Sequence, residues 1–266
     1  MKKAIIYSCS SDIGYELCIH LHKQGYWVVA TYLTYSAKVN NLESMGIETL
    51  RCDLSNSDDI DNSVKLFTRN GVKWDLLVLL QATMNPIGRF DTLDFKEWEK
   101  SLDLNFTKQI KIIQRLLPYR NINASVITFA GGGTNNATKN YSAYTISKIA
   151  LIKMMELLYE EYNDTKFTCL GPGWVDTKIH QETFHAKELA YEAYLKTIER
   201  YQNNNFTPME KILECIDWIL SEKIEVVSGR NFSIANDLWA TDKLVAKLTS
   251  DSNMYKLRRE GNVWQI

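Results

Sequence analysis

Short apolar runs alternate with helix-like segments along most of the chain, and this alternation constrains the fold more than any other feature. The run at residues 4–7 is followed by a polar loop and by a segment whose apolar spacing predicts a helix up to Gly25. Repeated strand–helix units of this length predict a parallel sheet with helices on both faces, the doubly wound α/β architecture. We expect a sheet of about seven strands.

The other elements are predicted from the same spacing. We expect strands at residues 26–32, 47–52, 76–80, 124–130, 167–170 and 230–234, and helices at residues 38–45, 58–69, 98–117, 144–162 and 208–220. The run at 76–80 is almost wholly apolar, which suits a strand buried on both faces. Pro118 is expected to end the helix at 98–117.

Residues 179–205 leave this alternation. They are helical in character and rich in Glu, Lys, Tyr and Asn. We interpret them as an insertion over the carboxyl ends of the strands, where sheets of this kind bind ligands. No Pro/Gly/Ser-rich linker divides the chain, so residues 1–266 are expected to form a single domain.

Charge and cysteine content argue against several classes of protein. The formal net charge is −1 and no basic run is present, which disfavours a nucleic-acid partner or a membrane surface. The five cysteines form no Cys-x-x-Cys pair and are expected to be reduced and buried in a cytoplasmic protein. His180 and His185 lie five residues apart without a carboxylate cluster, so no metal site is expected.

Two stretches could carry chemistry. The loop at residues 7–14, Tyr-Ser-Cys-Ser-Ser-Asp-Ile-Gly, lies where a dinucleotide site needs backbone N–H groups and a helix N-terminus, but a polar loop without function fits equally well. Tyr144 and Lys148 lie one helical turn apart, and a cationic neighbour can lower the phenol pKa from its usual value of about 10. Such a pair also occurs by chance on surface helices.

Read together, five stretches make the chain resemble the short-chain dehydrogenase/reductase family from its first strand to about residue 234. The matches are the loop at 7–14 with the family's glycine-rich loop, Asp53 with its acidic residue after the third strand, Asn105 with its helix-four asparagine, Tyr144 to Lys148 with its Tyr-x-x-x-Lys motif, and residues 172–177 with its Pro-Gly-x-x-x-Thr stretch. The resemblance implies a Rossmann fold and an NAD(P)-dependent oxidoreductase.

The resemblance also implies roles for individual residues. Tyr144 would pass a proton to or from the substrate oxygen, Lys148 would lower the Tyr144 pKa and hold the nicotinamide ribose, and Asn105 would bend its helix and hold a water linking Lys148 to solvent. Trp174 is expected beside the nicotinamide; His180 is either a substrate contact or a solvated loop residue. The implied cofactor-binding residues are Ser8, Ser10, Ser11, Asp12, Ile13, Gly14, Tyr32, Asp53, Leu54, Gln81, Ala82, Tyr144, Lys148, Pro172, Gly173, Val175 and Thr177.

The chain departs from the family pattern at two places that concern the site. Ser8 and Asp12 replace the first two glycines of the loop, although the Ser10 and Ser11 hydroxyls and the helix N-terminus could still bind the pyrophosphate. The Asp12 carboxylate need not repel a phosphate if it caps the helix that follows. The family serine falls on Gly131. Three alternatives stay open there: Thr134 supplies the hydroxyl, glycine N–H groups at 131–133 donate instead, or the function is lost.

Cofactor preference is read from the end of the second strand, where a carboxylate would accept from the ribose 2′-OH and repel a 2′-phosphate. Residues 31–34, Thr-Tyr-Leu-Thr, contain no acid. We therefore favour NADP(H) over NAD(H), with Thr34, Ser36 or Lys38 as phosphate partners.

The expected function is hydride transfer between nicotinamide and a carbonyl or secondary alcohol of a small molecule, of acyl or sugar type. A dinucleotide-binding sensor or structural partner that has lost catalysis is the alternative, and a nucleotide-sugar epimerase is disfavoured because no second substrate domain is expected. The helices at 98–117 and 144–162 carry more apolar residues than one buried stripe requires, which favours a homodimer or homotetramer, with a fully packed core as the competing explanation.

Overall fold

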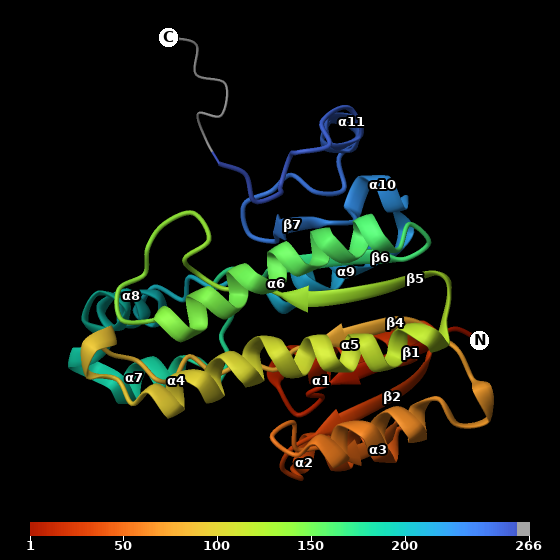
Figure 1. Ribbon diagram of the computed structural model, residues 1–266, viewed down its shortest axis with the longest axis horizontal. Helices are drawn as coiled ribbons and strands as arrows, with labels where there is room; N and C mark the ends of the chain where they lie inside the picture. Colours follow the sequence, from red (N-terminus) through yellow and green to blue (C-terminus); the bar gives the residue numbers. More distant parts are fainter. Residues whose placement is uncertain (260–266) are drawn as a thin grey trace.

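The computed structural model describes residues 1–259. Within them, seven strands form one sheet in the order β3-β2-β1-β4-β5-β6-β7, and every neighbouring pair is parallel (Figure 1). The predicted doubly wound sheet of about seven strands is therefore confirmed. The strands are β1 (Lys3–Tyr7), β2 (Trp27–Tyr32), β3 (Glu48–Arg51), β4 (Trp74–Leu79), β5 (Arg120–Phe129), β6 (Lys166–Gly171) and β7 (Arg230–Ser233).

The central strands are buried on both faces, as the apolar run at 76–80 predicts. Leu77 and Val78 in β4 are fully buried, and so are their β1 partners Ile5 and Ile6. Successive side chains point to opposite faces of a strand, so the pair Ile6 and Val78 enters the core on one side of the sheet and the pair Ile5 and Leu77 enters the core on the other.

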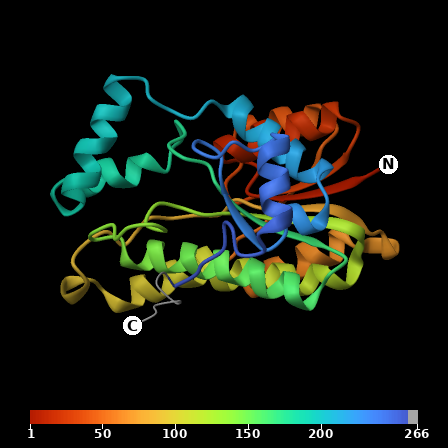
Figure 2. The same cartoon turned by 90° about the horizontal axis from the view of Figure 1, so that it is seen from above.

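Helices cover both faces of this sheet (Figure 2). Helices α1, α2, α9, α10 and α11 pack on one face, and α3, α5 and α6 pack on the other. The helices are α1 (Asp12–Lys23), α2 (Ala37–Ser44), α3 (Ser57–Phe67), α4 (Phe95–Leu102), α5 (Lys108–Leu116), α6 (Ser142–Glu161), α7 (His180–Ala186), α8 (Tyr191–Gln202), α9 (Met209–Ser221), α10 (Ile224–Val227) and α11 (Asp242–Ser250). The last two were not predicted from the sequence.

The helix predicted at 98–117 is interrupted. It begins three residues earlier as α4, after Asp94, whose side chain accepts from Lys96 N, and a π-helical segment at Asp103–Thr107 separates it from α5. A π-helical segment adds one residue to a turn and is frequent at functional sites. Pro118 lies in the 3₁₀ turn that follows, so the helix ends where the proline predicts.

Residues 180–202 form two helices, α7 and α8, over the carboxyl ends of the strands (Figure 1). An aromatic cluster holds them together: the Phe184 ring lies 6.0 Å from the Tyr194 ring and 5.3 Å from the Tyr201 ring, centroid to centroid. The predicted insertion thus has a small core of its own, which gives it a defined shape above the sheet.

Three further findings concern residues 1–259. The five cysteines are free and buried. Across residues 1–259, every helix is too short or too polar to span a bilayer. The same residues hold no group of three or more His, Cys, Asp and Glu side chains placed to bind a metal ion.

Candidate active site

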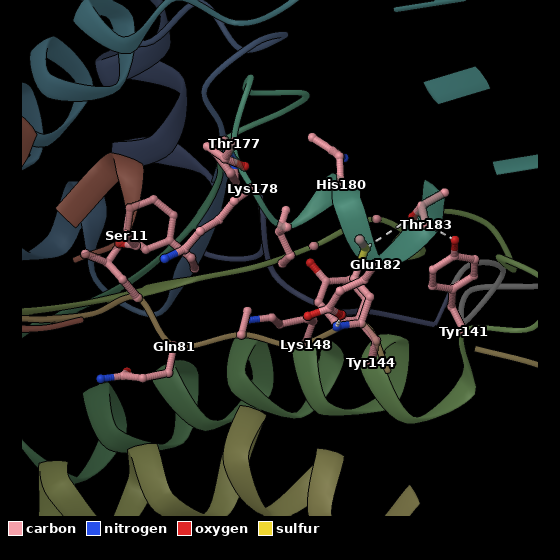
Figure 3. Close-up of a pocket in the computed structure, with 18 of the residues that line it drawn as sticks. Ser11, Gln81, Tyr141, Tyr144, Lys148, Thr177, Lys178, His180, Glu182 and Thr183 are labelled. Carbon is pink, nitrogen blue, oxygen red and sulfur yellow. Dashed lines mark hydrogen bonds between the residues drawn. The ribbon is translucent and has the colours of Figure 1, made fainter. Parts of the chain in front are cut away.

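A cavity of about 1740 Å³ lies at the carboxyl ends of the strands, beneath the insertion (Figure 3). A typical site for one small molecule occupies roughly 300–1,000 Å³, so this cavity has room for a dinucleotide and a second molecule. The sequence-predicted residues in its wall are Ser8, Ser10, Ser11, Asp12, Ile13, Tyr32, Asp53, Leu54, Gln81, Ala82, Thr134, Tyr144, Lys148, Pro172, Gly173, Trp174, Val175, Thr177 and His180. Gly14 and Asn105 lie behind the wall.

Where the loop after β1 enters α1, the position of Gly14 has no room for a side chain. A Cβ on Gly14 would overlap the Ser8 carbonyl oxygen and lie 2.8 Å from Ser11 Oγ, so only glycine allows this approach. Ser8 itself has φ of 78°, the left-handed conformation that glycine adopts most easily. The backbone path of a glycine-rich loop is therefore kept although Ser8 carries a side chain.

The expected helix cap at Asp12 is wrong, because Ser11 takes that role. Ser11 Oγ accepts from Gly14 N at 3.1 Å, while Asp12 is already inside the helix. The Asp12 carboxylate instead accepts from Lys38 Nζ at 2.5 Å and from Lys178 N at 3.0 Å. Burial opposes its charge, but these bonds hold the pKa of Asp12 below its ordinary value.

Two polar residues that follow β2 and β3, Ser36 and Asp53, already form hydrogen bonds with their neighbours in the chain. Asp53 Oδ1 accepts from Ser55 N at 2.9 Å and from Ser55 Oγ at 2.7 Å, and these bonds lower the pKa of Asp53. Ser36 caps α2 through Val39 N. Thr34 and Lys38 line the cavity, so the end of β2 presents hydroxyl and ammonium groups and no carboxylate.

Tyr144 and Lys148 extend from one face of α6 into the cavity (Figure 3). Lys148 is 3% exposed, and its Nζ lies 5.7 Å from the centroid of the Tyr144 ring. Burial lowers the pKa of Lys148 to about 8. Burial, followed by the charge of Glu182, raises the pKa of Tyr144. Lys148 is not among the groups that shift this pKa, and the lowering expected from its charge stays a prediction.

Gly131 lies against Tyr144. A Cβ on Gly131 would overlap the Tyr144 hydroxyl oxygen and lie 2.6 Å from Cε1 and Cζ of the ring. The tyrosine thus fills the space beside the backbone into which a serine side chain would extend. Thr134 donates to the Gly131 carbonyl oxygen at 3.4 Å, so its hydroxyl is turned back onto its own loop.

Asn105 is fully buried in the π-helical segment and holds the loop after β4. Its Oδ1 accepts from Thr83 N at 2.9 Å, and its Nδ2 donates to Thr83 O at 2.8 Å. Gln109 donates to Asn105 O at 2.9 Å and to Gln81 O at 2.9 Å. The bend of the helix and the path of the cavity wall are thereby fixed together.

Trp174 and His180 pack on each other. Their rings are stacked with centroids 4.9 Å apart and planes 7° apart. The His180 Nε2 atom is 2.9 Å from Val175 O, and burial lowers the pKa of His180. His180 is therefore not a freely solvated loop residue. Its Nε2 atom is bonded to the loop at Val175 O, which leaves only the other ring nitrogen for a substrate.

Glu182 is a site residue that sequence reasoning missed. It lines the cavity from α7, and its carboxylate accepts from Thr83 Oγ1 at 3.0 Å, from Met84 N at 2.6 Å and from Asn85 N at 3.1 Å. Nothing in the sequence distinguishes it from the other acids of the insertion, because its partners lie about a hundred residues away.

The residues of this cavity fit a dinucleotide. The Gly14 cradle and the N-terminus of α1 provide the backbone approach that a pyrophosphate requires. Three buried polar atoms in residues that line the cavity have no hydrogen-bond partner within the protein, as a polar ligand site would leave them: Gln81 Oε1, Thr145 Oγ1 and Asn231 Oδ1.

A doubly wound sheet with a dinucleotide cradle and a Tyr/Lys pair defines an oxidoreductase of the Rossmann class. The family model described as enoyl-(acyl carrier protein) reductase matches residues 9–236. Dehydrogenase/reductase SDR family member 6 of Rattus norvegicus is 23% identical over 234 residues, covering 86% of this chain and 93% of the relative. The chain belongs to the short-chain dehydrogenase/reductase family.

Two solved structures show the same fold. A short-chain dehydrogenase/reductase from Saccharomyces cerevisiae superposes with a TM-score of 0.79 at 21% identity, covering 90% of this chain and 97% of that one. An actinorhodin polyketide ketoreductase with NADPH gives a TM-score of 0.76 at 17% identity, covering 89% and 98%. At these identities the likeness concerns the fold alone.

Proposed function

We propose that this protein transfers a hydride between a nicotinamide cofactor and a carbonyl or secondary alcohol of a small molecule, with Tyr144 as the acid/base. One observation carries the proposal: Tyr144 and Lys148 extend from α6 into the cavity whose other end is formed by the loop after β1. A bound NAD(P)(H) supplies or accepts the hydride.

The chain's own groups hold and move the proton. Tyr144, with a raised pKa, is protonated near neutral pH and donates to the oxygen of a carbonyl substrate. Lys148, with a pKa of about 8, carries charge at neutral pH and lies close enough to stabilise the phenolate that results. Asn105 fixes the helix bend behind them and is proposed to hold a water that connects Lys148 to solvent.

NADP(H) is the proposed cofactor because Lys38 and Thr34 line the cavity beyond β2, where no acid is present. Asp12 pairs with Lys38, so a 2′-phosphate must compete with that carboxylate. Lys38→Ala should weaken NADPH binding at least tenfold and NADH binding less than twofold, measured by fluorescence titration. Equal losses for both cofactors would argue against a phosphate role.

A cofactor-binding sensor is the second candidate, favoured by the absence of a serine beside Tyr144. Two measurements separate it from the enzyme. NADPH binding is followed by cofactor fluorescence, and turnover is assayed on a panel of neutral ketones, acyl thioesters and keto sugars with wild type and Tyr144→Phe. The enzyme predicts turnover that falls at least a hundredfold in the variant while binding is retained. Binding with no Tyr144-dependent turnover would favour the sensor.

A homodimer or homotetramer through the helices predicted at 98–117 and 144–162 is proposed, and a cytoplasmic location is proposed with it. Ile146 is 50% exposed and Leu157 48% on the second helix, whereas the surplus apolar residues Ile113, Leu117, Ile152, Met155 and Leu158 are buried, as a packed core requires. Light scattering after size exclusion tests this, and a monomer at micromolar concentration would contradict it.

A further inference from the structure

The carboxylate of Glu182 is the acidic group that faces Tyr144 from the insertion. Figure 3 shows Glu182 and Thr183 descending from α7, opposite Tyr144 on α6. Tyr144 packs against the cluster that contains Met84, and Met84 N donates to the Glu182 carboxylate, so the two side chains lie on the same part of the cavity wall.

This carboxylate is fixed in place. It accepts from three groups of the loop after β4: Thr83 Oγ1, Met84 N and Asn85 N. Asn105 holds Thr83 from the other side through both its backbone N and its backbone O. Because the loop that binds the Glu182 carboxylate is itself held by Asn105, the carboxylate stays in position when a ligand enters.

Seven lysines line the cavity, among them Lys196 of α8. Lys38, Lys100 and Lys108 are paired with Asp12, Glu97 and Asp103. The Lys148 side chain extends from α6 toward Gln81, at the dinucleotide end (Figure 3). The Lys178 ammonium is 3.4 Å from Ser10 O, also at that end. Lys139 is 3.5 Å from Glu192 at an exposed position, so its charge is already paired. Beside Tyr144 the wall therefore carries the anchored carboxylate of Glu182 on one side and the Lys148 ammonium on the other.

We propose that Glu182 is a specificity-determining residue that rejects substrates with a negative charge next to the reacting carbon and admits neutral or cationic ones. This inference rests on the proposed hydride transfer at Tyr144. A carboxylate or phosphate beside the reacting carbon would be repelled by the Glu182 carboxylate, which its bonds to the loop after β4 hold in place. The inference narrows the substrate class to neutral or cationic carbonyl compounds and alcohols.

The test compares an α-keto ester with the matching α-keto acid in the NADPH-loaded enzyme. We expect wild type to favour the ester in kcat/KM by at least a hundredfold. Glu182→Gln removes the charge with little change of shape and should shrink this ratio at least tenfold by improving the acid. Glu188→Gln makes the same charge change on an exposed residue outside the cavity wall and should leave the ratio unchanged.

A binding measurement gives a readout that does not depend on turnover. Oxamate, an unreactive analogue of a 2-oxo acid, should bind the NADPH complex of Glu182→Gln at least tenfold more tightly than that of wild type, by isothermal titration calorimetry. Limited trypsin digestion at Lys187, Lys196 and Arg200 checks that the insertion stays folded in the variant. Glu182→Ala should instead be cut faster.

The outcomes separate the two proposals. If no carbonyl compound is turned over yet oxamate binding improves in Glu182→Gln, the electrostatic role stands and the proposed reaction fails. If wild type favours the α-keto acid, or if neither the ratio nor oxamate binding changes in Glu182→Gln, the inference about Glu182 is overturned.

Discussion

The ring of Tyr144 occupies the space that a side chain on Gly131 would need, because a Cβ there would overlap the tyrosine hydroxyl. The glycine at this position is therefore coupled to the position of the acid/base. A serine can be added to this site only if the Tyr144 side chain shifts.

Gly131→Ser should lower kcat/KM at least tenfold, because the new Cβ displaces the Tyr144 hydroxyl from its present position. Gly131→Ala is the matched control: it adds the same Cβ without the hydroxyl and should lose activity to a similar extent. Steady-state kinetics on a turned-over carbonyl compound measures both. Activity above wild type in Gly131→Ser would show that the serine was simply missing.

Ser8→Gly should raise the free energy of unfolding by about 0.5–1 kcal/mol, because Ser8 has a positive φ of 78° that costs a residue with a Cβ more than glycine. Ser8 N donates to Thr31 Oγ1 and Ser8 O accepts from Ser11 Oγ, and glycine retains both backbone atoms. Urea denaturation measures the change. Ser8→Ala keeps the Cβ and should give no gain, and a gain of equal size there would rule out backbone strain as the cause.

Lys148→Met should abolish turnover and stabilise the protein at pH 7. Burial lowers the pKa of Lys148 from 10.5 to about 8, a gap worth roughly 3 kcal/mol at about 1.4 kcal/mol per unit, so the gain has this upper limit. The penalty of the buried ammonium is complete below pH 8 and disappears between pH 8 and 10.5. The advantage of the variant should therefore shrink over that interval in urea titrations, and a gain that does not depend on pH would point to packing instead.

Carbonyl reduction should fall as pH rises through about 8, because the Lys148 ammonium loses its proton there and no longer stabilises the Tyr144 phenolate. The measurement is kcat/KM against pH from 6 to 10 with saturating NADPH. Lys148→Arg, which stays charged over this interval, should move the decline to higher pH. A profile that is flat through pH 9 would mean that the charge of Lys148 is not required.

Asn105→Ala should lower the free energy of unfolding by about 2–3 kcal/mol, because it leaves Thr83 N and O without their partner in a buried setting. Thermal and urea unfolding measure this loss. Asn236→Ala, at an exposed asparagine bonded to Ser233, is the control and should change stability by less than about 0.5 kcal/mol. A similar small effect at Asn105 would contradict its role as the clamp of the loop.

The parallel sheet was predictable from the local sequence pattern, because buried strands and amphipathic helices each have a characteristic spacing of apolar residues. The interruption of the helix at Asn105 was not, since a π-helical segment depends on contacts with Thr83 twenty-two residues away. The role of Asp12 was also predicted wrongly. A helix cap depends on neighbouring residues, whereas the contacts of Asp12 with Lys38 and Lys178 require the first turns of α1 and α2 to meet the loop after β6.

The sequence by itself determined the alternating architecture, the position of the Tyr144/Lys148 pair and the absence of a serine at residue 131. Only the tertiary structure decided what that absence means: the tyrosine fills the space, and burial sets the pKa values of both partners. The tertiary structure also places Glu182 in the wall of the cavity. Desolvation and long-range contact depend on which segments pack together, and no local pattern in the sequence records that.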